Sequence, residues 1–185
     1  MTLAFYVLTK SGVLLYSQQV TLTNYILNQP NPLLIAGFFS AIEMFAKEFA
    51  NDSIDSIEMG AYSLHFSSDK ETKCIFCLGY PKKYEESKFK YLLNTLKLFF
   101  IYYFKKYLLK NTSNLSPFKK FDPVFNLILE AFEINSEIIK IEHFICGYLG
   151  DLRDFQSKKG FICPKCRKRL SEDGVDYRLK LDKEV

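Results

Sequence analysis

The stretch FYVLTKSGVLLYS, Phe5–Ser17, decides how the fold begins. Two apolar runs, Leu3–Leu8 and Val13–Val20, flank the segment Thr9-Lys10-Ser11-Gly12, which supplies turn residues. Apolar runs of this length that are joined by a Gly-containing turn are typical of a β-hairpin. The chain is therefore predicted to open with two antiparallel strands and without an N-terminal helix.

The following segments alternate between helical and strand-like patterns. Leu33–Phe49 is predicted to be a helix, because apolar residues recur on one face at three- and four-residue spacings. These residues are Leu34, Phe38, Ile42, Phe45 and Phe49. Three short strands are predicted at Ile54–Met59, Tyr62–Ser67 and Lys73–Tyr80, and a long helix at Tyr84–Lys110.

A shorter helix, with Asp122 as its cap and Val124–Phe132 as its body, completes this part of the chain. Consecutive strands of this kind favour an antiparallel sheet, and helices packed on it give an α+β fold. We therefore expect one five-stranded antiparallel sheet within residues 1–134, followed by a small module over residues 135–185.

The order of elements resembles that of the longin-like group, within the wider roadblock and profilin-like architecture. The resemblance is carried by FYVLTKSGVLLYS, by the helix PLLIAGFFSAIEMFAKEF, and by IDSIEMGAYSLHF leading into KCIFCLGYP. It covers roughly residues 1–132. A roadblock domain usually opens with a helix and this chain does not, which favours longin. The resemblance implies a non-enzymatic platform that binds small GTPases, coat or tether subunits, or another domain of its own kind.

The segment HFICGYLGDLRDFQSKKGFICPKC, residues 143–166, holds three of the five cysteines and one of the two histidines. His143 and Cys146 form one pair of possible ligands, and Cys163 and Cys166 form a second pair. Two residues between ligands let a turn direct both side chains at one ion, and this separation of pairs matches a zinc ribbon. We predict one structural Zn²⁺, because four protein ligands leave no open position for catalysis.

The same segment resembles zinc-ribbon modules at the C-terminus of archaeal signalling proteins. Those modules share an HxxCG turn, a Phe, a CPKC turn and a GVDY segment; this chain has HFICG, Phe155, CPKC and Gly174–Tyr177. Gly147 can adopt the positive φ that the chain needs as it passes the metal. Arg167 departs from the pattern, because a Gly is common after the last Cys, and it is expected to strain that turn.

Other candidate residues have plainer interpretations. Cys74 and Cys77 also form a Cys-x-x-Cys pair, but they lie in an apolar strand, where residues three apart face opposite sides. We expect them to be buried and to bind no metal. His65 is predicted to be a surface or packing residue. In the long helix, one sheet cannot cover every side, so some of Ile101, Tyr102 and Phe104 are expected to contact another chain.

Composition limits the possible functions. The net charge is only +4, with a basic cluster at Lys165–Arg169, so nucleic-acid binding is an alternative that composition does not favour. The apolar run Leu98–Phe104 is far shorter than the ~20 residues of a membrane span. Met1–Tyr16 lacks the features of a signal peptide, which predicts a cytoplasmic protein whose clustered cysteines bind metal.

Three function classes follow from these patterns. The first is a non-enzymatic adaptor or regulator that binds a small GTPase or another longin- or roadblock-type subunit, with a homodimer as one form. The second is a nucleic-acid-associated zinc-ribbon factor. The third is an enzyme, for which no dinucleotide-binding, P-loop or nucleophile-elbow motif is found. The sequence favours the first.

Overall fold

The computed structural model describes residues 2–21, 31–51, 54–110, 114–133, 139–157, 160–171 and 177–181. The chain divides into two compact units. The sheet unit consists of Met1–Lys97 and Lys106–Lys119, and the C-terminal unit of Leu98–Lys105 and Lys120–Val185. The boundary between residues 134 and 135 stays a prediction. Among the described residues, no helix is long and apolar enough to cross a membrane.

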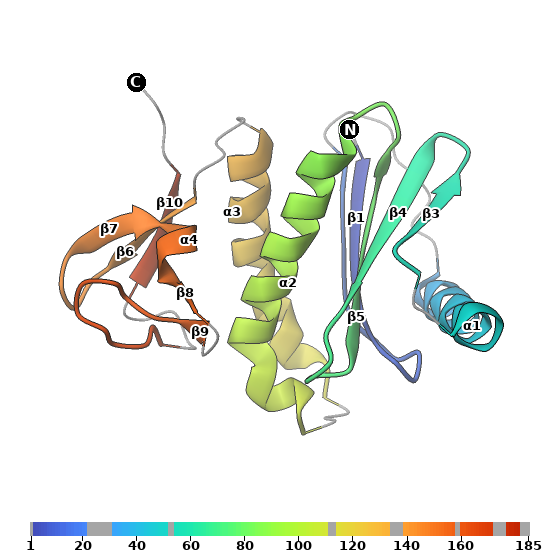
Figure 1. Cartoon of the computed structure of the whole chain (residues 1–185), viewed down its shortest axis with the longest axis horizontal. Helices are drawn as coiled ribbons and strands as arrows, with labels where there is room; N and C mark the ends of the chain where they lie inside the picture. The colour runs from blue at the N-terminus through green and yellow to red at the C-terminus, as the bar shows by residue number, and fades with distance from the viewer. Residues whose placement is uncertain are drawn as a thin grey trace. The chain divides into compact units, whose positions relative to one another are not determined.

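The sheet unit contains one five-stranded sheet with helices, as the sequence predicts (Figure 1). Its elements are β1 (Thr2–Thr9), β2 (Leu14–Thr21), α1 (Pro32–Ala50), β3 (Ser56–Met59), β4 (Tyr62–Ser68), β5 (Cys74–Pro81), and α2 (Glu86–Leu108), which continues into the C-terminal unit. The strands lie in the order β2-β1-β5-β4-β3, and every neighbouring pair is antiparallel. The predicted α+β fold class is therefore confirmed.

The two faces of the sheet are covered by different helices (Figure 1). On one face, Phe39 of α1 packs edge-on against Tyr6 and Phe66, with ring centroids 5.8 and 5.3 Å apart. On the other face, Phe89 of α2 stacks on Tyr80, with centroids 4.0 Å apart. Strand residues alternate between these two environments, which is the geometry of a sheet buried on both sides.

Helix α1 forms where the sequence predicts it, but it meets the sheet with a different face. The side chains that it buries are Ala36, Phe39 and Ala46. The apolar residues that the helical pattern singled out are mostly exposed: Leu34, Phe38, Phe45 and Phe49. Phe39 packs on the sheet together with the small residues Ala36 and Ala46, and the four exposed residues lie on another face of the helix.

The turn between β1 and β2 packs against α1. Gly12 has a φ of +82°, and a Cβ at this position would lie 2.8 Å from Oγ of Ser40 in α1. A left-handed conformation and a close neighbour both require a glycine here. The first hairpin thus helps to fix α1 on its side of the sheet.

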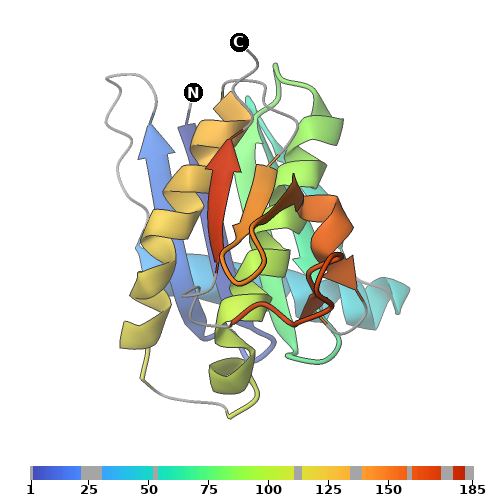
Figure 2. The same cartoon turned by 90° about the vertical axis from the view of Figure 1, so that its left-hand side faces the viewer.

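The C-terminal unit contains a second, smaller sheet (Figure 2). Its elements are part of α2, α3 (Asp122–Glu133), β6 (Ile139–His143), β7 (Tyr148–Asp151), α4 (Leu152–Phe155), β8 (Gln156–Ser157), β9 (Gly160–Phe161) and β10 (Tyr177–Leu181). Strand β6 lies between β10 and β7 in an antiparallel three-stranded sheet, and β8 pairs with β9. Gly174, Val175 and Asp176 of the GVDY segment lie outside the described residues.

Part of α2 completes the core of this unit. The ring of Phe161 stacks on Phe99 and meets Tyr102 edge-on, with centroids 5.1 and 4.7 Å apart. The Tyr102 hydroxyl donates a hydrogen bond to the carbonyl of Leu170. The Tyr177 hydroxyl donates to that of Tyr103 over 2.7 Å. Helix α2 is therefore part of the hydrophobic core around the metal-binding turns.

This packing narrows one expectation for the long helix. Some of Ile101, Tyr102 and Phe104 were expected to contact another chain; Tyr102 and Phe104 are buried, and only Ile101 of the three is partly exposed. Tyr102 lies against Phe161, and Phe104 packs against Phe100 and Phe121. The sequence pattern did not show that a later part of the same chain covers this side of α2.

Candidate metal centre

The structure brings together the four residues that the sequence predicts as ligands. His143 ends β6, Cys146 lies in the turn before β7, and Cys163 and Cys166 lie in the turn after β9. One ligand atom from each residue can be chosen so that all four lie within 4.8 Å of one another. The arrangement could therefore hold a metal ion.

Three of the distances between ligand atoms are close to those of a tetrahedral metal site. Nδ1 of His143 lies 3.3 Å from Sγ of Cys146 and 3.4 Å from Sγ of Cys166, and the Sγ atoms of Cys146 and Cys163 are 3.5 Å apart. Bonds of about 2.0–2.3 Å to a central ion place neighbouring ligands roughly 3.4–3.8 Å apart. A disulfide would need sulfur atoms about 2.05 Å apart, so these are separate thiols in position for one ion.

The two turns that carry the ligands share the same backbone hydrogen bond and the same left-handed residue. The amide of Gly147 donates to the carbonyl of His143 over 2.8 Å, and the amide of Arg167 donates to that of Cys163 over 2.9 Å. Gly147 has a φ of +64° and Arg167 a φ of +60°. A residue after the second ligand must be left-handed in both turns, which glycine adopts freely and arginine does not. The predicted strain at Arg167 is thus present in the structure.

The four candidate ligands are not equally buried. His143 and Cys163 are fully buried, whereas Cys146 and Cys166 are partly exposed. Burial raises the pKa of Cys146, but it is outweighed by hydrogen bonds from the Tyr148 amide and from the side chains of the cluster, so this pKa falls to about 7. Burial raises the pKa of Cys163. Cys146 therefore forms a thiolate more readily than the buried Cys163 does.

Basic side chains surround the second turn. Lys165 donates from Nζ to the carbonyl of Cys146 over 3.2 Å, so it links the two turns. Lys165, Arg167, Lys168 and Arg169 are all exposed. Three bound thiolates and one neutral imidazole would give a site with Zn²⁺ a net charge of −1, and the neighbouring cations offset it.

Cys74 and Cys77 lie outside this cluster, as predicted. Both are buried in β5, and Cys77 belongs to the apolar cluster between the sheet and α1. Cys74 lies three residues earlier, so it faces the opposite side of the sheet, where its Sγ is 3.6 Å from the carbonyl of Thr72. Burial raises the pKa of both thiols, that of Cys77 far above its usual value. The expectation that these two thiols bind no metal stays a prediction.

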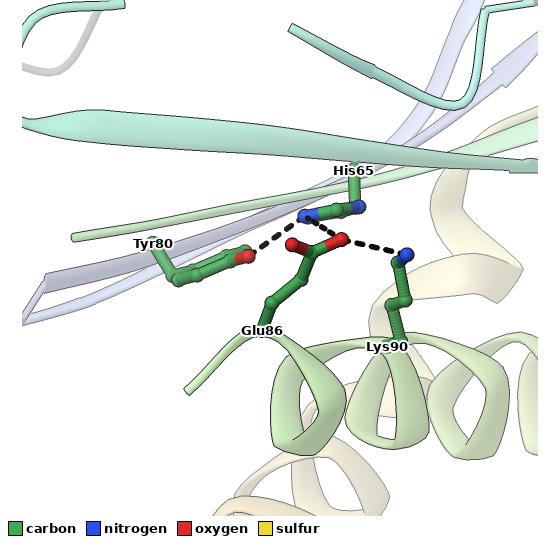
Figure 3. A network of polar contacts seen from close by, with 4 residues as sticks. All are labelled: His65, Tyr80, Glu86 and Lys90. Carbon is green, nitrogen blue, oxygen red and sulfur yellow. Dashed lines mark hydrogen bonds and ion pairs between the residues drawn. The ribbon is translucent and has the colours of Figure 1, made fainter. Parts of the chain in front are cut away.

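A second polar cluster, not anticipated from the sequence, lies between the sheet and the start of α2 (Figure 3). Nε2 of His65 is 2.7 Å from the Tyr80 hydroxyl and 3.7 Å from Oε1 of Glu86, which in turn is 2.6 Å from Nζ of Lys90. His65 is buried, as a packing residue with a hydrogen-bond partner would be. Its burial lowers its pKa, against an opposing effect of Glu86. This cluster attaches α2 to β4 and β5.

Comparisons with known proteins give one match in the C-terminal unit. Residues 130–184 match the family model TackOD1, described as Thaumarchaeal output domain 1. This match contains all four candidate ligands and none of the five-stranded sheet. No curated protein matches the chain.

Several solved structures are similar at the level of the fold. The mammalian SRP receptor is 16% identical with a TM-score of 0.46, and the match covers 72% of this chain and 96% of that chain. Myxococcus xanthus MglB is 17% identical with a TM-score of 0.33, covering 45% and 68%. A homology model of the full-length AP-3 complex in an intermediate open conformation is 16% identical with a TM-score of 0.36, covering 78% of this chain and 35% of that chain. At these values the likenesses carry no argument about function.

Proposed function

We propose that this protein is a non-enzymatic adaptor or regulator, whose sheet unit binds a small GTPase or a related trafficking or signalling partner. Its C-terminal unit would be stabilised by one zinc ion. The proposal is supported by the longin resemblance of residues 1–132 and by the α+β fold that this resemblance implies. The name of the matched domain, an output domain, is consistent with a role in signalling.

The observation that carries the proposal is the uncovered apolar surface of α1. We call this surface the α1 stripe, which consists of Leu34, Phe38, Ile42, Phe45 and Phe49. The exposed fractions are 72% for Leu34, 42% for Phe38, 64% for Phe45 and 81% for Phe49. A contiguous apolar surface of this kind marks an interaction site in a monomeric domain, because its exposure to water is unfavourable.

Zinc is the ion that the donor set favours. Three cysteine thiolates and one histidine form one of the common ligand sets of structural zinc sites. Soft thiolate ligands disfavour Mg²⁺ and Ca²⁺, which prefer oxygen. The atoms that would bind the ion are Nδ1 of His143 and the sulfur atoms of Cys146, Cys163 and Cys166. Four protein ligands leave no position for a substrate, which is why the proposed role is structural.

The proposed location is the cytoplasm. A reducing compartment keeps clustered cysteines as thiols, in the form that binds a metal. Among the described residues, all five cysteines are free of disulfides. This part of the proposal would be tested by the distribution of a tagged full-length chain between soluble and membrane fractions of cells.

The test of the adaptor function is direct binding to small GTPases. Zinc-loaded wild-type protein would be immobilised and exposed to purified small GTPases carrying GDP or a non-hydrolysable GTP analogue. Binding that depends on the nucleotide is the expected result. Phe45→Asp, which places a charge in the α1 stripe, should abolish it, whereas Tyr91→Asp, at an exposed aromatic residue on α2, should not. A panel in which no GTPase binds would contradict this function.

Exposed basic residues favour one alternative function. Lys165, Arg167, Lys168 and Arg169 are exposed around the second metal-binding turn, as a contact with nucleic acid would require. Binding of this kind weakens steeply with salt, because phosphate contacts release counterions. Salt-dependent retention on single- or double-stranded nucleic acid that is lost in a Lys168→Glu, Arg169→Glu variant would support it. This alternative leaves the α1 stripe without a role.

A further inference from the structure

The first metal-binding turn, residues 143–147, exposes two adjacent apolar side chains. They belong to Phe144 and Ile145, and their exposed fractions are 51% and 54%. Among the described residues of the C-terminal unit, the other large apolar side chains that are exposed are Leu98 and Leu149. The pair lies where the β6–β7 hairpin turns, so it can enter an apolar phase ahead of the strands that carry it.

The second metal-binding turn, residues 163–167, lies directly beside this apolar pair. The Sγ atoms of Cys146 and Cys163, one from each turn, are 3.5 Å apart. Nζ of Lys165 donates a hydrogen bond over 3.2 Å to the carbonyl of Cys146, the residue that follows Ile145. An ammonium group of the second turn therefore lies within one residue of the exposed apolar pair of the first.

The surroundings of the two turns are cationic. Residues 160–171 contain four basic residues and no Asp or Glu. All four basic residues are exposed: Lys165, Arg167, Lys168 and Arg169. The hairpin that carries the first turn has its acidic residues in the strands, at Glu142 and Asp151, and both are only partly exposed. Because four cations exceed the net charge of −1 that a zinc-loaded centre would have, the two turns stay positively charged.

We propose that the two metal-binding turns dock on an anionic lipid bilayer. Phe144 and Ile145 enter the boundary between headgroups and acyl chains, while the basic residues of the second turn contact the acidic headgroups. Shallow apolar insertion beside clustered cations is how peripheral proteins bind such surfaces. Lys165 suits this position, because its aliphatic stem can lie along the apolar layer with its ammonium group among the headgroups. This contact gives the C-terminal unit a role beyond the adaptor function of the sheet unit.

The size of the apolar pair favours a bilayer over a protein partner. Taking ~200 Å² for a whole aromatic side chain, Phe144 exposes about 100 Å², and Ile145 exposes a similar area or less. A standard protein interface takes ~800 Å² from each partner, several times what this pair offers. A bilayer needs no matching shape, and a small insertion is sufficient when a basic patch accompanies it.

The chemistry of the pair also favours a bilayer over nucleic acid. Binding to nucleic acid comes largely from contacts between cations and phosphates, which would leave the apolar pair in water. Single strands add stacking on aromatic rings, and Ile145 has no ring to offer. A bilayer with acidic headgroups is the partner that uses the apolar pair and the cations together.

The test is cosedimentation of the zinc-loaded full chain with lipid vesicles at low salt. Vesicles of phosphatidylcholine and phosphatidylserine should bind the chain at about 1 mM lipid, where even the ~10⁴ M⁻¹ of a single acyl chain retains most of a protein. Vesicles of phosphatidylcholine alone should not bind it. High salt should release the chain by screening the charges, which is compatible with a cytoplasmic protein that binds membranes reversibly.

Two variants separate the apolar contribution from the charge. Ile145→Asn should weaken vesicle binding roughly three- to ten-fold, the effect of burying half of an Ile side chain. Lys168→Gln should weaken it about five-fold, as expected for one basic residue near an anionic surface. Leu109→Asn is the matched control, because Leu109 is 52% exposed in the sheet unit, and binding should be unchanged. Metal content and circular dichroism will show that each variant folds.

Insertion itself can be observed by fluorescence, because the chain contains no tryptophan. Ile145→Trp keeps an apolar side chain in the first turn and supplies the single fluorophore. Its emission should shift to the blue when phosphatidylserine vesicles are added, whereas that of Leu109→Trp should not shift. This readout does not depend on Ile145→Asn retaining its metal, and adhesion by charge alone would leave it unchanged.

Four results would overturn the proposal. They are a wild-type chain that does not sediment with phosphatidylserine vesicles, equal binding to both kinds of vesicle, an Ile145→Asn variant that binds as tightly as wild type, and an Ile145→Trp variant without a blue shift. Retention on nucleic acid without vesicle binding would support the alternative function instead. The measurement contains no GTPase and leaves the α1 stripe intact, so a failure of the adaptor function would appear only in the GTPase binding experiment.

Discussion

Strand β5 and the turn after β9 both contain a Cys-x-x-Cys sequence, but only the pair in the turn brings its two thiols together. Cys74 and Cys77 lie in an extended strand that directs them to opposite faces of a sheet. Cys163 and Cys166 lie in a turn that ends in a left-handed residue, and it brings both thiols to one point. The comparison teaches that a motif has chemical meaning only through the backbone that carries it.

The comparison extends to the way in which each region is stabilised. Strand β5 is buried along nearly its whole length, so its thiols are packing groups, kept protonated by their burial. The metal-binding turns are short and partly exposed, and a bound ion can supply the stabilisation that a small core lacks. The predictions below test this contrast, beginning with the largest expected effect.

Cys163→Ser should have the largest effect. The hydroxyl does not replace a thiolate as a ligand, and structural zinc binding is worth roughly 10–16 kcal/mol in small peptides near neutral pH. The variant should lose its metal, and the strands β6, β7 and β10 should lose protection from hydrogen exchange. Elemental analysis and exchange followed by mass spectrometry measure both. Because Phe161 packs on Phe99, exchange should also rise in the second half of α2.

The sheet unit serves as the internal control for this variant. Strands β1 and β5 should keep their protection, since the apolar cluster of Tyr6, Phe39 and Cys77 involves no metal ligand. Wild-type protein that is purified without chelator and contains no metal, with β6 and β7 still protected, would disprove the zinc site.

Cys77→Ser should have an intermediate effect. The new hydroxyl would replace a fully buried thiol among apolar side chains, at a cost of about 1–3 kcal/mol if it finds no partner. Chemical denaturation measures this loss. Cys77→Ala is the matched variant, which removes the sulfur without adding a polar group. Zinc content should be unchanged in both, and in the double variant Cys74→Ser, Cys77→Ser. A lost zinc would show that the wrong cysteines were assigned.

The His65 cluster should produce a smaller effect that depends on pH. Burial lowers the pKa of His65 in the folded protein, so the unfolded chain binds the proton more tightly. The contribution of neutral His65 to stability is present above about pH 6.5 and is lost as the pH falls below that value. The difference in unfolding free energy between wild type and His65→Gln, measured in urea from pH 8 to pH 5, should therefore shrink with acid.

Tyr80→Phe tests the same His65 cluster from the tyrosine side. It removes the hydroxyl that lies 2.7 Å from His65, and should cost about 1 kcal/mol at neutral pH, as a typical hydrogen bond does. Acid also releases metal from the C-terminal unit, but this loss is common to all three proteins and cancels in the differences. A wild-type advantage that is constant from pH 8 to pH 5 would contradict the role given to His65.

Arg167→Gly should have the smallest effect, and a stabilising one. Glycine avoids the ~1–2 kcal/mol of strain that another residue has in the left-handed conformation, but its freedom in the unfolded chain costs ~0.5–1 kcal/mol. The net gain is about 1 kcal/mol or less, or up to roughly five-fold in metal affinity. Competition with a chelator measures it. Arg167→Ala removes the same charge but keeps the strain, so it should show no gain. In the other turn, Gly147→Ala should weaken binding, although no atom lies within 4 Å of the new Cβ.

The sequence by itself determined the features that depend on short segments. The spacing of His143, Cys146, Cys163 and Cys166 predicted the metal cluster, because two residues between ligands define a turn whatever surrounds it. The hairpin at the start was predicted from two apolar runs joined by turn residues, and the helices α1 and α2 from apolar periodicity, which are also properties of short segments. The sequence also indicated that a left-handed residue is needed after each ligand pair. Gly147 occupies this position in the first turn, and Arg167 occupies it in the second.

The tertiary structure decided which surfaces meet. Helical periodicity located α1, but its exposed face was settled by the fit of Ala36 and Phe39 to the sheet. The packing of Phe99 and Tyr102 on Phe161, and the meeting of His65 with Tyr80, join residues distant in the sequence. Strand β7, helix α4 and the β8–β9 pair are too short to show a period. Contacts of this kind depend on the shapes of both partners, and no single segment contains that information.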